Sequence, residues 1–377
     1  MSGVIVRRVE GRRDLRRFVK VPFHLHRDHP RWVPPLVSER MQFLNRRRNP
    51  YFEHAEAEYF IAERDGEPAG RITAQVDERW DSYQGGSDGM FGFFETANDP
   101  QAAAALLDAA ADWVRERGRA RILGPMDFTT NDETGILIEG YDRRPMILEP
   151  WHPPHYRELI EAQGFEKAMD LLMWWLRLGE LKEGDRFDPE LHAAAQRGLA
   201  EHGITIRNMR KGDMEAEVTR FMEVYNEAWG ENWGFVPVTE AEVAFQAKNL
   251  KQVLDEDWAY IAEKDGETIA AALSLPDVNQ VLSGMNGRLL PFGWLKFLRG
   301  KRRVDQLRVL ALGVKKDYQH TGTAAGLYLR HIETAAWHRI KQGEMGWILE
   351  TNEPMNRAME GMGGRVVKRY RVYERSL

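Results

Sequence analysis

The stretch from residue 307 to residue 329 carries the residues with the clearest chemical use, in an apolar run that passes through a Gly-containing turn into a helical pattern. The turn holds a glutamine, a glycine and an alanine at the spacing Q-x-x-G-x-A, with two threonines beside the glycine: Gln319, Thr321, Gly322, Thr323 and Ala324. A strand that enters a helix through such a turn presents unpaired backbone N–H groups and the positive end of the helix. Those groups bind a pyrophosphate without a charged side chain, so the pattern predicts a diphosphate-binding turn. The alternative is an ordinary strand, turn and helix.

A polar group in the first half of the chain has the chemistry to handle the proton of an amine. Asn131, Asp132 and Glu133 stand directly before the apolar run 135–140. A carboxylate that lies between two α/β units can orient or deprotonate an ammonium group. The alternative is an Asx-type turn whose side chains bond to the local backbone. Either Asp132 or Glu133 is therefore a candidate catalytic base.

The elements that position the diphosphate turn follow from the pattern after it. An apolar strand ends at Thr351, Pro354 stands at a first helical position, and Gly363 stops a short helix. Residues 365–377 alternate apolar and basic side chains, as a closing strand does. The predicted order is strand, phosphate turn, helix, strand, short helix and strand.

This order, together with the Q-x-x-G-x-A spacing, resembles the second half of a domain of the GCN5-related N-acetyltransferase (GNAT) superfamily. The resemblance implies acyl-CoA as cosubstrate, with its diphosphate at the turn and its pantetheine arm paired with the preceding strand. It implies main-chain contacts from Leu312 and Val314, and an amide near Leu312 or Gly313 that faces the thioester oxygen. It also implies that Asn352 and Asn356 contact the cofactor from the short helix.

The proton donor for the departing thiolate does not follow the superfamily pattern. GNAT enzymes often carry a tyrosine seven residues after the asparagine, and this chain has Met359 there, which cannot donate a proton. The nearby candidates are Tyr318, Tyr370 and Tyr373, of which Tyr373 is taken as the catalytic candidate. One alternative is that water protonates the thiolate. The other is that this half of the chain binds its ligand without catalysing transfer.

The chain also resembles itself. Residues 60–67, FIAERDGE, return 200 positions later as residues 260–267, YIAEKDGE. Each copy is an apolar strand that runs into an Asp-Gly turn, which is a hairpin signal. At the same offset, a segment starting at Pro154 and ending at Gly164 matches the one from Pro354 to Gly364. The repeat predicts two copies of one α/β unit.

The predicted fold is therefore α/β with a mixed sheet, in two tandem GNAT-like domains over residues 1–178 and 186–377. Residues 179–190 are polar, contain Gly and Pro, and are predicted to link the domains. A single long α/β domain with a chance repeat is the alternative.

The two copies differ at the position of the phosphate turn. In the first copy Asn98 or Asp99 is the predicted N-cap of an Ala-rich helix, and Pro100 lies in its first turn. No glycine there lets a backbone approach a pyrophosphate. The first copy is therefore predicted to lack a CoA site and to act as scaffold or substrate wall.

Composition narrows the remaining possibilities. The 377 residues contain no cysteine, which excludes disulfides, thiolate metal sites and an acyl-cysteine intermediate, so acyl transfer would be direct. The net charge of -5 argues against a general nucleic-acid binder. His24, His26 and His29 do not share one helical face, so no metal is expected. No apolar run is long enough to cross a bilayer, which makes a cytoplasmic location the expectation.

Residues 288–303, RLLPFGWLKFLRGKRR, combine an apolar, aromatic-rich body with a dense positive edge. Such a segment suits the headgroup boundary of an anionic membrane, on the inner face of which the protein would bind peripherally. The alternative is a helix docked on the protein's own core with a solvated basic run.

Four segments, HRDHPRWVPPL, NDETGILIEGYDRRPM, LLPFGWLKFL and TNEPMNRAMEGMGG, resemble a bacterial family of tandem GNAT-like proteins along the whole chain. That family includes bacterial ceramide synthases, which transfer a fatty acyl group from acyl-CoA to a sphingoid base. The resemblance implies a CoA-dependent N-acyltransferase for a primary amine, with a long-chain lipid amine as the favoured acceptor. Acetyl transfer to a small polar amine or a protein amino group is one alternative, and a non-catalytic CoA- or lipid-binding module is another.

Overall fold

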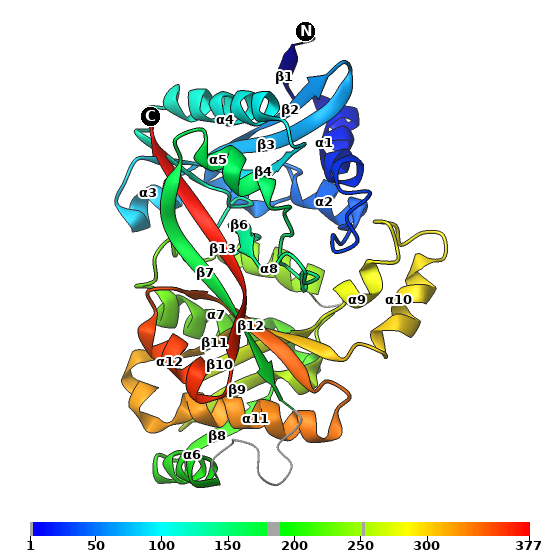
Figure 1. Cartoon of the computed structure of the whole chain (residues 1–377). Helices are drawn as coiled ribbons and strands as arrows, with labels where there is room; N and C mark the ends of the chain where they lie inside the picture. Colours follow the sequence, from blue (N-terminus) through cyan, green and yellow to red (C-terminus); the bar gives the residue numbers. More distant parts are fainter. Residues whose placement is uncertain (1–2, 179–188, 251–252) are drawn as a thin grey trace.

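One mixed β-sheet runs through the whole molecule, with helices on both of its faces (Figure 1). This computed structural model describes residues 3–178, 189–250 and 253–377, so the predicted linker lies, up to residue 188, outside the described residues. Within those residues the sheet has 13 strands in the order β1-β2-β3-β4-β5-β13-β7-β12-β11-β10-β9-β8, and β6 pairs with β13. The predicted α/β fold with a mixed sheet is confirmed.

Each half of the chain supplies one end of this sheet. The N-terminal half holds β1 (Val4–Arg8), β2 (Ala55–Arg64), β3 (Glu67–Asp77), β4 (Asp88–Thr96), β5 (Arg121–Gly124), β6 (Ile136–Glu139) and β7 (Glu166–Arg177). Its helices are α1 (Gly11–Leu25), α2 (Val37–Phe43), α3 (Glu78–Gln84), α4 (Pro100–Arg115) and α5 (His155–Glu161), with the short 3-10 helix η1 (Pro50–Glu53).

The C-terminal half has a similar order of elements, with a helix added before its first strand, two helices in the place of α3 and, among the described residues, no counterpart of β6. Its strands are β8 (Ile204–Asn208), β9 (Ala259–Lys264), β10 (Glu267–Pro276), β11 (Gln306–Val314), β12 (Gln342–Leu349) and β13 (Arg365–Ser376). Its helices are α6 (Pro189–Glu201), α7 (Met214–Trp229), α8 (Glu240–Leu250), α9 (Asn279–Leu282), α10 (Gly293–Lys301), α11 (Thr323–Trp337) and α12 (Glu353–Gly361), and the 3-10 helices are η2 (Lys211–Asp213), η3 (Glu256–Trp258) and η4 (Lys316–Thr321).

Two matching hairpins show the repeat at the level of single residues. β2 and β3 pair through Arg64 and Glu67, and β9 and β10 pair through Lys264 and Glu267. The turn residues between them have φ of 54° and 82° in the first hairpin and 50° and 84° in the second. Two consecutive positive φ values define a type I′ turn, which favours Asp-Gly. The hairpin prediction is confirmed at both places.

In each half, side chains that alternate along the strands pack into two apolar layers, one on each face of the sheet. In β2, Phe60 and Ala62 pack with Leu106 of α4, whereas Ile61 faces the other side and packs with Phe18 of α1. In β9, the equivalent alternation places Tyr260 with Leu327 of α11 and Ile261 with Val224 of α7. Each half is thus an α/β/α sandwich, as expected for strands buried on both faces.

The two halves exchange their last strands. β13, from the end of the chain, pairs with β5 and β6 of the N-terminal half as well as with β7, and β7 pairs with β12 of the C-terminal half. Figure 1 shows these two long strands crossing from one half to the other. Because the sheet continues without a break through them, the domain limits 1–178 and 186–377 stay a prediction.

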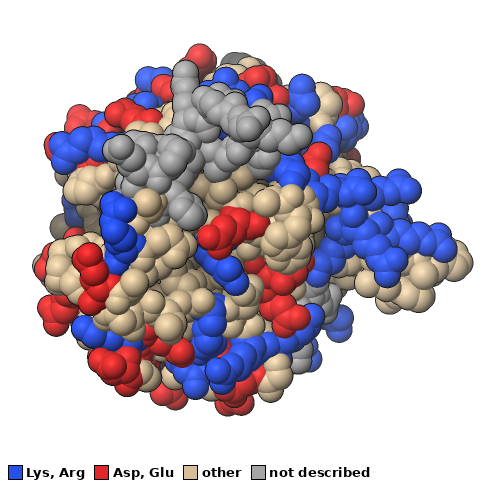
Figure 2. Space-filling model, turned by 90° about the horizontal axis from the view of Figure 1, so that it is seen from below, with Lys and Arg blue, Asp and Glu red and all other residues tan. Residues whose placement is uncertain are grey.

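The segment with α9 and α10 projects from the side of the sheet in Figure 1. Figure 2 shows Lys and Arg side chains gathered on this projection. Among the described helices, none has the length and apolar character that crossing a bilayer requires.

His54 joins the two halves through ion pairs and makes stability depend on pH. Its Nδ1 lies 2.9 Å from Asp77 Oδ1 and its Nε2 lies 3.2 Å from Glu242 Oε1 of α8. Burial opposes protonation, but the two carboxylates prevail and raise the pKa of His54 to about 9. Since the folded pKa lies above the ordinary value of about 6.5, this stabilisation is complete below that pH and is lost as pH rises through about 9.

We expect His54→Gln to remove this pH dependence. Between about pH 6 and pH 10 the wild-type free energy of unfolding should fall by about 1 to 3 kcal/mol more than that of the variant, measured by urea denaturation. Parallel curves for the two proteins over that range would contradict the assignment.

Candidate active site

The predicted diphosphate turn lies between β11 and α11 and leaves its backbone amides available. Gly322 has φ of 78°, in the left-handed region, and a Cβ added there would meet nothing within 4 Å. Within the described part of the chain, no side chain caps the N-terminus of α11. The hydroxyls of Thr321 and Thr323 lie 2.6 Å apart and brace the turn from inside. Gln319 donates from Nε2 to the Val314 carbonyl at 3.4 Å, so its role here is to hold the turn.

The equivalent helix of the N-terminal half, α4, is already capped. Asp99 accepts hydrogen bonds from the amides of Gln101 and Ala102, and Arg64 pairs with the same carboxylate at 2.8 Å. Asp99 as N-cap, followed by Pro100, is the predicted arrangement and is confirmed. The amides that α11 leaves available for an anion are therefore satisfied by the protein itself in α4.

β11 and β12 are parallel neighbours that part halfway along. They pair only from Gln306 to Val309 on the β11 side. On the other edge β10 pairs with β11, and the register shift leaves Leu310 without a partner, which is a β-bulge. Beyond the bulge Lys315 N–H bonds to Ile269 of β10, and alternate residues of a strand face the same edge. The main chain of Leu312 and Val314 therefore faces the gap toward β12, where an added strand-like group can pair.

Gly313 allows close packing against α7, and its main chain does not face the open edge of β11. A Cβ at this position would lie 2.1 Å from a ring carbon of Trp229 of α7. By the same alternation its amide points to β10. Of the two amides expected to face a thioester oxygen, that of Leu312 faces the gap and that of Gly313 does not.

The short helix α12 begins one residue before the predicted position, at Glu353. Asn352 caps it by accepting from the amide of Met355 at 3.2 Å. Asn356 donates to the Leu349 carbonyl at 3.1 Å and accepts from Trp174 Nε1 at 3.0 Å, so its amide is engaged within the protein. Met359 is fully buried in the core beneath the helix, which explains an apolar residue at this position.

The three candidate tyrosines point to different places. Tyr373 donates to Glu161 of α5 at 3.0 Å and belongs to the core of the N-terminal half, so the structure does not bring it to the β11 turn. Tyr318 lies 3.3 Å from Glu267 at the β9–β10 hairpin. Tyr370 donates to the Pro150 carbonyl at 3.1 Å, close to the cavity described next.

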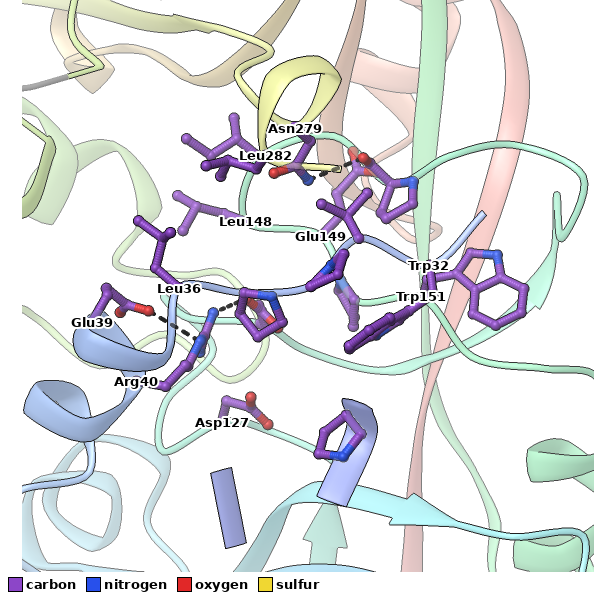
Figure 3. Close-up of a pocket in the computed structure, with 18 of the residues that line it drawn as sticks. Trp32, Leu36, Glu39, Arg40, Asp127, Leu148, Glu149, Trp151, Asn279 and Leu282 are labelled. Carbon is purple, nitrogen blue, oxygen red and sulfur yellow. Dashed lines mark hydrogen bonds and ion pairs between the residues drawn. The ribbon is translucent and has the colours of Figure 1, made fainter. Parts of the chain in front are cut away.

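A cavity of about 240 Å³ lies between the two halves (Figure 3). One wall is apolar and is formed by Leu36, Leu148, Val253, Leu282, Leu289 and Phe297. The polar wall carries five carboxylates and two cations: Glu39, Glu95, Asp127, Glu133, Glu149, Arg40 and Arg71. Acidic side chains thus outnumber basic ones on the polar wall, and this wall and the apolar wall together suit a ligand that has a cationic head and an aliphatic body.

Both sequence-predicted carboxylates lie between the halves, but only one reaches the cavity. Glu133 lines it and forms an ion pair with Arg40 of α2. Asp132 does not line the cavity and accepts from the Thr129 hydroxyl at 3.0 Å. Desolvation raises the pKa of Asp132 to about 7. Their catalytic roles stay a prediction.

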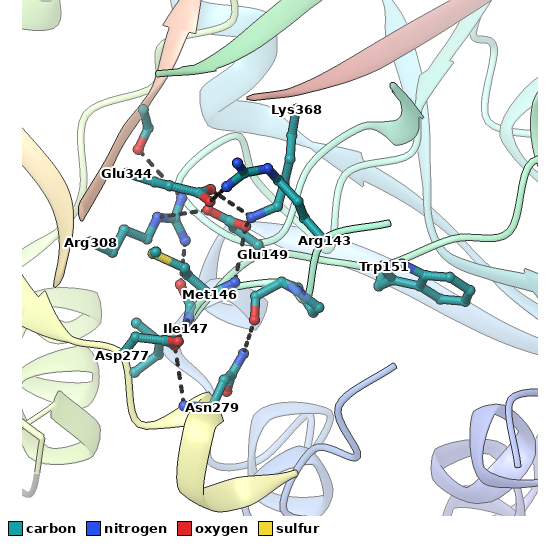
Figure 4. A network of polar contacts seen from close by, with 12 residues as sticks. Arg143, Met146, Ile147, Glu149, Trp151, Asp277, Asn279, Arg308, Glu344 and Lys368 are labelled. Atoms are coloured by element: carbon teal, nitrogen blue, oxygen red, sulfur yellow. Dashed lines mark hydrogen bonds and ion pairs between the residues drawn. The ribbon is translucent and has the colours of Figure 1, made fainter. Parts of the chain in front are cut away.

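A buried ion network joins this cavity to the point where β11 and β12 part (Figure 4). Lys368 of β13 lies 2.8 Å from Glu149 and 2.6 Å from Glu344 of β12, all three side chains being at most 3% exposed. Burial alone would raise the pKa of Glu149, but Lys368 and Arg308 lower it below its usual value. Arg308 of β11 also donates to the Ile147 carbonyl at 2.5 Å. The cavity therefore shares a wall with the parting strands.

In the N-terminal half the matching gap between β4 and β5 is filled by the chain itself. β4 and β5 pair only from Asp88 to Met90, and β4 carries a register shift next to Phe93. Beyond the paired part, Met126 N–H bonds to the Phe91 carbonyl at 2.8 Å. Phe93 N–H donates to Asp127 Oδ1 at 2.7 Å. This segment occupies the edge of β4 that corresponds to the part of β11 beyond Val309, where no described strand pairs on the β12 side.

Sequence reasoning missed Asp127, Glu149 and Arg308. One signal was present, because Arg308 is a lone charge within an apolar strand pattern, and such a charge needs a buried partner. Glu149 and Asp127 lie in irregular segments, where no periodicity separates buried from exposed side chains.

Comparison with known proteins gives two relatives that match along nearly the whole chain. The bacterial ceramide synthase of Caulobacter vibrioides (strain NA1000 / CB15N) is 37% identical over 373 residues, which cover 97% of this chain and 95% of that protein. Protein YghO of Escherichia coli (strain K12) is 36% identical over 379 residues, covering 99% and 95%. No family model matches the sequence.

Solved structures share the fold at low sequence identity. A tandem GNAT protein from the clavulanic acid biosynthesis pathway aligns with a TM-score of 0.57 and 13% identity over 99% of this chain and 98% of its own. A GCN5-related N-acetyltransferase from Sphaerobacter thermophilus aligns with a TM-score of 0.54 and 13% identity, over 99% and 95%. At these identities the likeness establishes the fold. Together with the sequence relatives, it shows that the chain belongs to the family of tandem GNAT-like N-acyltransferases that includes the bacterial ceramide synthase of Caulobacter vibrioides.

Proposed function

We propose that the acceptor of this N-acyltransferase is the primary amine of a long-chain lipid, such as a sphingoid base, and that the acyl group comes from acyl-CoA bound to the C-terminal half. The observation that carries the proposal is the cavity between the halves, which pairs a carboxylate-rich wall with an aliphatic one. A small polar amine would leave the aliphatic wall without a partner.

The α9–α10 segment supports a lipid acceptor because one of its faces lines the cavity and the other is exposed. Leu289 and Phe297 line the cavity. Leu290 and Phe292 are 76% and 74% exposed on the outside of the same segment. Four exposed arginines accompany them: Arg288, Arg299, Arg302 and Arg303. A lipid could thus pass from a membrane surface to the cavity along one segment.

In the proposed reaction the neutral amine nitrogen attacks the thioester carbonyl carbon. The C–N bond forms, the C–S bond breaks, the ammonium proton goes to a base, and the thiolate leaves to be protonated as CoA. The free amides at Gly322 and the first turn of α11 would hold the diphosphate. The Leu312 amide would face the developing oxyanion, a contribution of about 2.7 to 4 kcal/mol for one donor.

Radiolabelled palmitoyl-CoA tests the acceptor directly. We expect a labelled amide with sphinganine, and at least about tenfold lower kcat/KM with spermidine or a lysine-containing peptide, because these leave the aliphatic wall unfilled. Acetyl-CoA as donor should be compared in parallel. Preferred transfer to spermidine or to the peptide would overturn the lipid assignment.

The exposed face of the α9–α10 segment is predicted to bind anionic vesicles. Leu290→Ser combined with Phe292→Ser should weaken binding to phosphatidylglycerol vesicles at least about tenfold, because each large apolar side chain contributes about 1.5 to 3 kcal/mol when fully buried. Sedimentation with vesicles measures this. Added salt should also weaken wild-type binding through the arginines.

A matched control comes from two apolar residues exposed elsewhere, Ile5 at 66% and Trp337 at 68%. Ile5→Ser combined with Trp337→Ser should leave vesicle binding unchanged. Equal losses in both double variants would show that exposed apolar area alone, and not this segment, controls binding.

A further inference from the structure

In the part of the chain that the structure describes, one carboxylate of the cavity has no cation at ion-pair distance. The other four each have a cation at ion-pair distance: Glu39 and Glu133 at Arg40, Glu95 at Arg71, and Glu149 at Lys368. Asp127 contacts the Phe93 amide through Oδ1, and among the described residues no hydrogen-bond partner contacts its Oδ2. Its side chain lines the cavity and the residue is only 9% exposed (Figure 3).

A buried carboxylate without a counter-charge is unfavourable unless a ligand supplies one. Burial, followed by the charge of Glu133, raises the pKa of Asp127 to about 8, while Arg40 and Arg71 act in the opposite direction. A ligand with a positive charge next to Oδ2 would reverse this shift. The cavity therefore offers one strong position for a cation.

The position of Asp127 also has a structural explanation in the repeat. The register shift beside Phe93 in β4 corresponds to the bulge at Leu310 in β11. In β11 the gap next to the bulge stays open, whereas in β4 the Asp127 carboxylate binds the amide. In the N-terminal half, an acidic side chain that faces the cavity thus lies at the position equivalent to the thioester position of the C-terminal half.

We propose that Asp127 binds the ammonium group of the acceptor, so that the cavity holds a primary alkylammonium ion with its nitrogen at Oδ2 and its chain against Leu36, Leu148 and Leu282. This proposal rests on the proposed lipid-amine acceptor and names the residue that recognises it.

Equilibrium binding to the full chain without acyl-CoA tests the site independently of catalysis. Dodecylamine and 1-dodecanol, both below their aggregation concentrations, share one chain and differ in the charged head. We expect isothermal titration to show the wild type binding dodecylamine at least about tenfold more tightly than 1-dodecanol. Asp127→Asn should abolish this preference, because the asparagine oxygen can still accept from Phe93 while the charge is gone.

A matched control is Asp88→Asn, at the start of β4, the strand whose Phe93 amide donates to Asp127. Asp88 is 6% exposed, pairs with Arg121 and does not line the cavity. This variant should keep the wild-type preference for the amine. A wild type without the preference, or an Asp127→Asn variant that retains it, would overturn the proposal.

Proton release gives a second readout that a purely structural role would not change. Burial raises the pKa of the Asp127 carboxyl, so an ammonium ion bound at Oδ2 should lower that pKa and favour release of the proton near pH 7. Titrations in buffers of different ionisation enthalpy should show proton release in the wild type and none in Asp127→Asn. No release in the wild type would contradict the site.

The binding and transfer experiments distinguish a failure of the Asp127 site from a failure of the proposed function. If the wild type prefers the amine but transfers no acyl group to any amine, the site stands and the acyltransferase acceptor proposal fails. If sphinganine is acylated while Asp127→Asn keeps the preference for dodecylamine, the acceptor proposal stands and the Asp127 site fails.

Discussion

Gly322→Val should raise the dissociation constant for acyl-CoA at least about 100-fold, because it would disturb two or more amide contacts to the diphosphate, each worth about 1.5 to 3 kcal/mol with a charged partner. Gly322 has φ of 78°, and a β-branched residue is strongly disfavoured there. The turn would have to change its backbone path, and the added methyl groups would enter the space in front of α11. Fluorescence titration with a labelled CoA measures the effect.

The control for backbone strain is Gly118→Val. Gly118 has φ of 75°, a Cβ there would also meet nothing within 4 Å, and it follows α4, away from the β11 turn. This variant should lose similar stability but keep the wild-type affinity for acyl-CoA. If Gly322→Val binds acyl-CoA as tightly as Gly118→Val does, the diphosphate assignment is wrong.

Lys368→Met should lower the free energy of unfolding by about 3 to 5 kcal/mol, as expected when one partner of a buried ion pair is removed. The substitution leaves Glu149 and Glu344 buried together. Among the described residues, the cations that remain within ion-pair distance are then Arg143, 3.6 Å from Glu344, and Arg308, 3.8 Å from Glu149. Urea denaturation at pH 7 measures the loss. A loss below about 1 kcal/mol, the range of surface pairs, would show that the network contributes little.

The pH dependence of this loss provides a further check on its cause. Without Lys368, the folded-state pKa of Glu149 should rise above the unfolded value of about 4.3, and the pKa of Glu344, which burial already raises, should rise further. Groups with a raised folded pKa favour the folded state at low pH, so the deficit of Lys368→Met should shrink as pH falls toward about 5. Lys167→Met is the surface control, since Lys167 is 41% exposed in its pair with Glu350. Its effect should stay below about 1 kcal/mol at either pH.

Local sequence signals were sufficient for the parts of the fold that depend on neighbours in the chain. The Asp-Gly hairpin turns at Asp65 and Asp265, the cap at Asp99 and the closing strand β13 all follow from a few adjacent residues. Their energetics are decided by φ preferences and by hydrogen bonds within one turn.

The strand exchange and the cavity could not be predicted in the same way. β7 and β13 carry alternating patterns that are compatible with several partners, and the pairing is decided by contacts across about half the chain. For Tyr373 the same pattern left open which neighbour its hydroxyl would meet, and Glu161 comes from a distant helix. Asp127, Arg308 and Lys368 meet their surroundings only after both halves are folded.

The absence of a glycine turn in the first copy pointed to a half without CoA, and the structure adds a physical reason for that proposal. Asp99 satisfies the helix amides, and the segment with Met126 and Asp127 lies against the free edge of β4. Both features would have to be displaced before a diphosphate and a pantetheine arm could bind there. We therefore propose that the first copy contributes to the acceptor site and does not bind CoA.

The most direct test of the central claim is a crystal structure of the full chain with CoA and dodecylamine. We expect the diphosphate within hydrogen-bond distance of the amides at Gly322 and the first turn of α11, the pantetheine arm beside Leu312, and the ammonium nitrogen at Asp127 with its chain against Leu282. CoA bound at α4, or a sulfur atom that points away from the cavity between the halves, would contradict this claim.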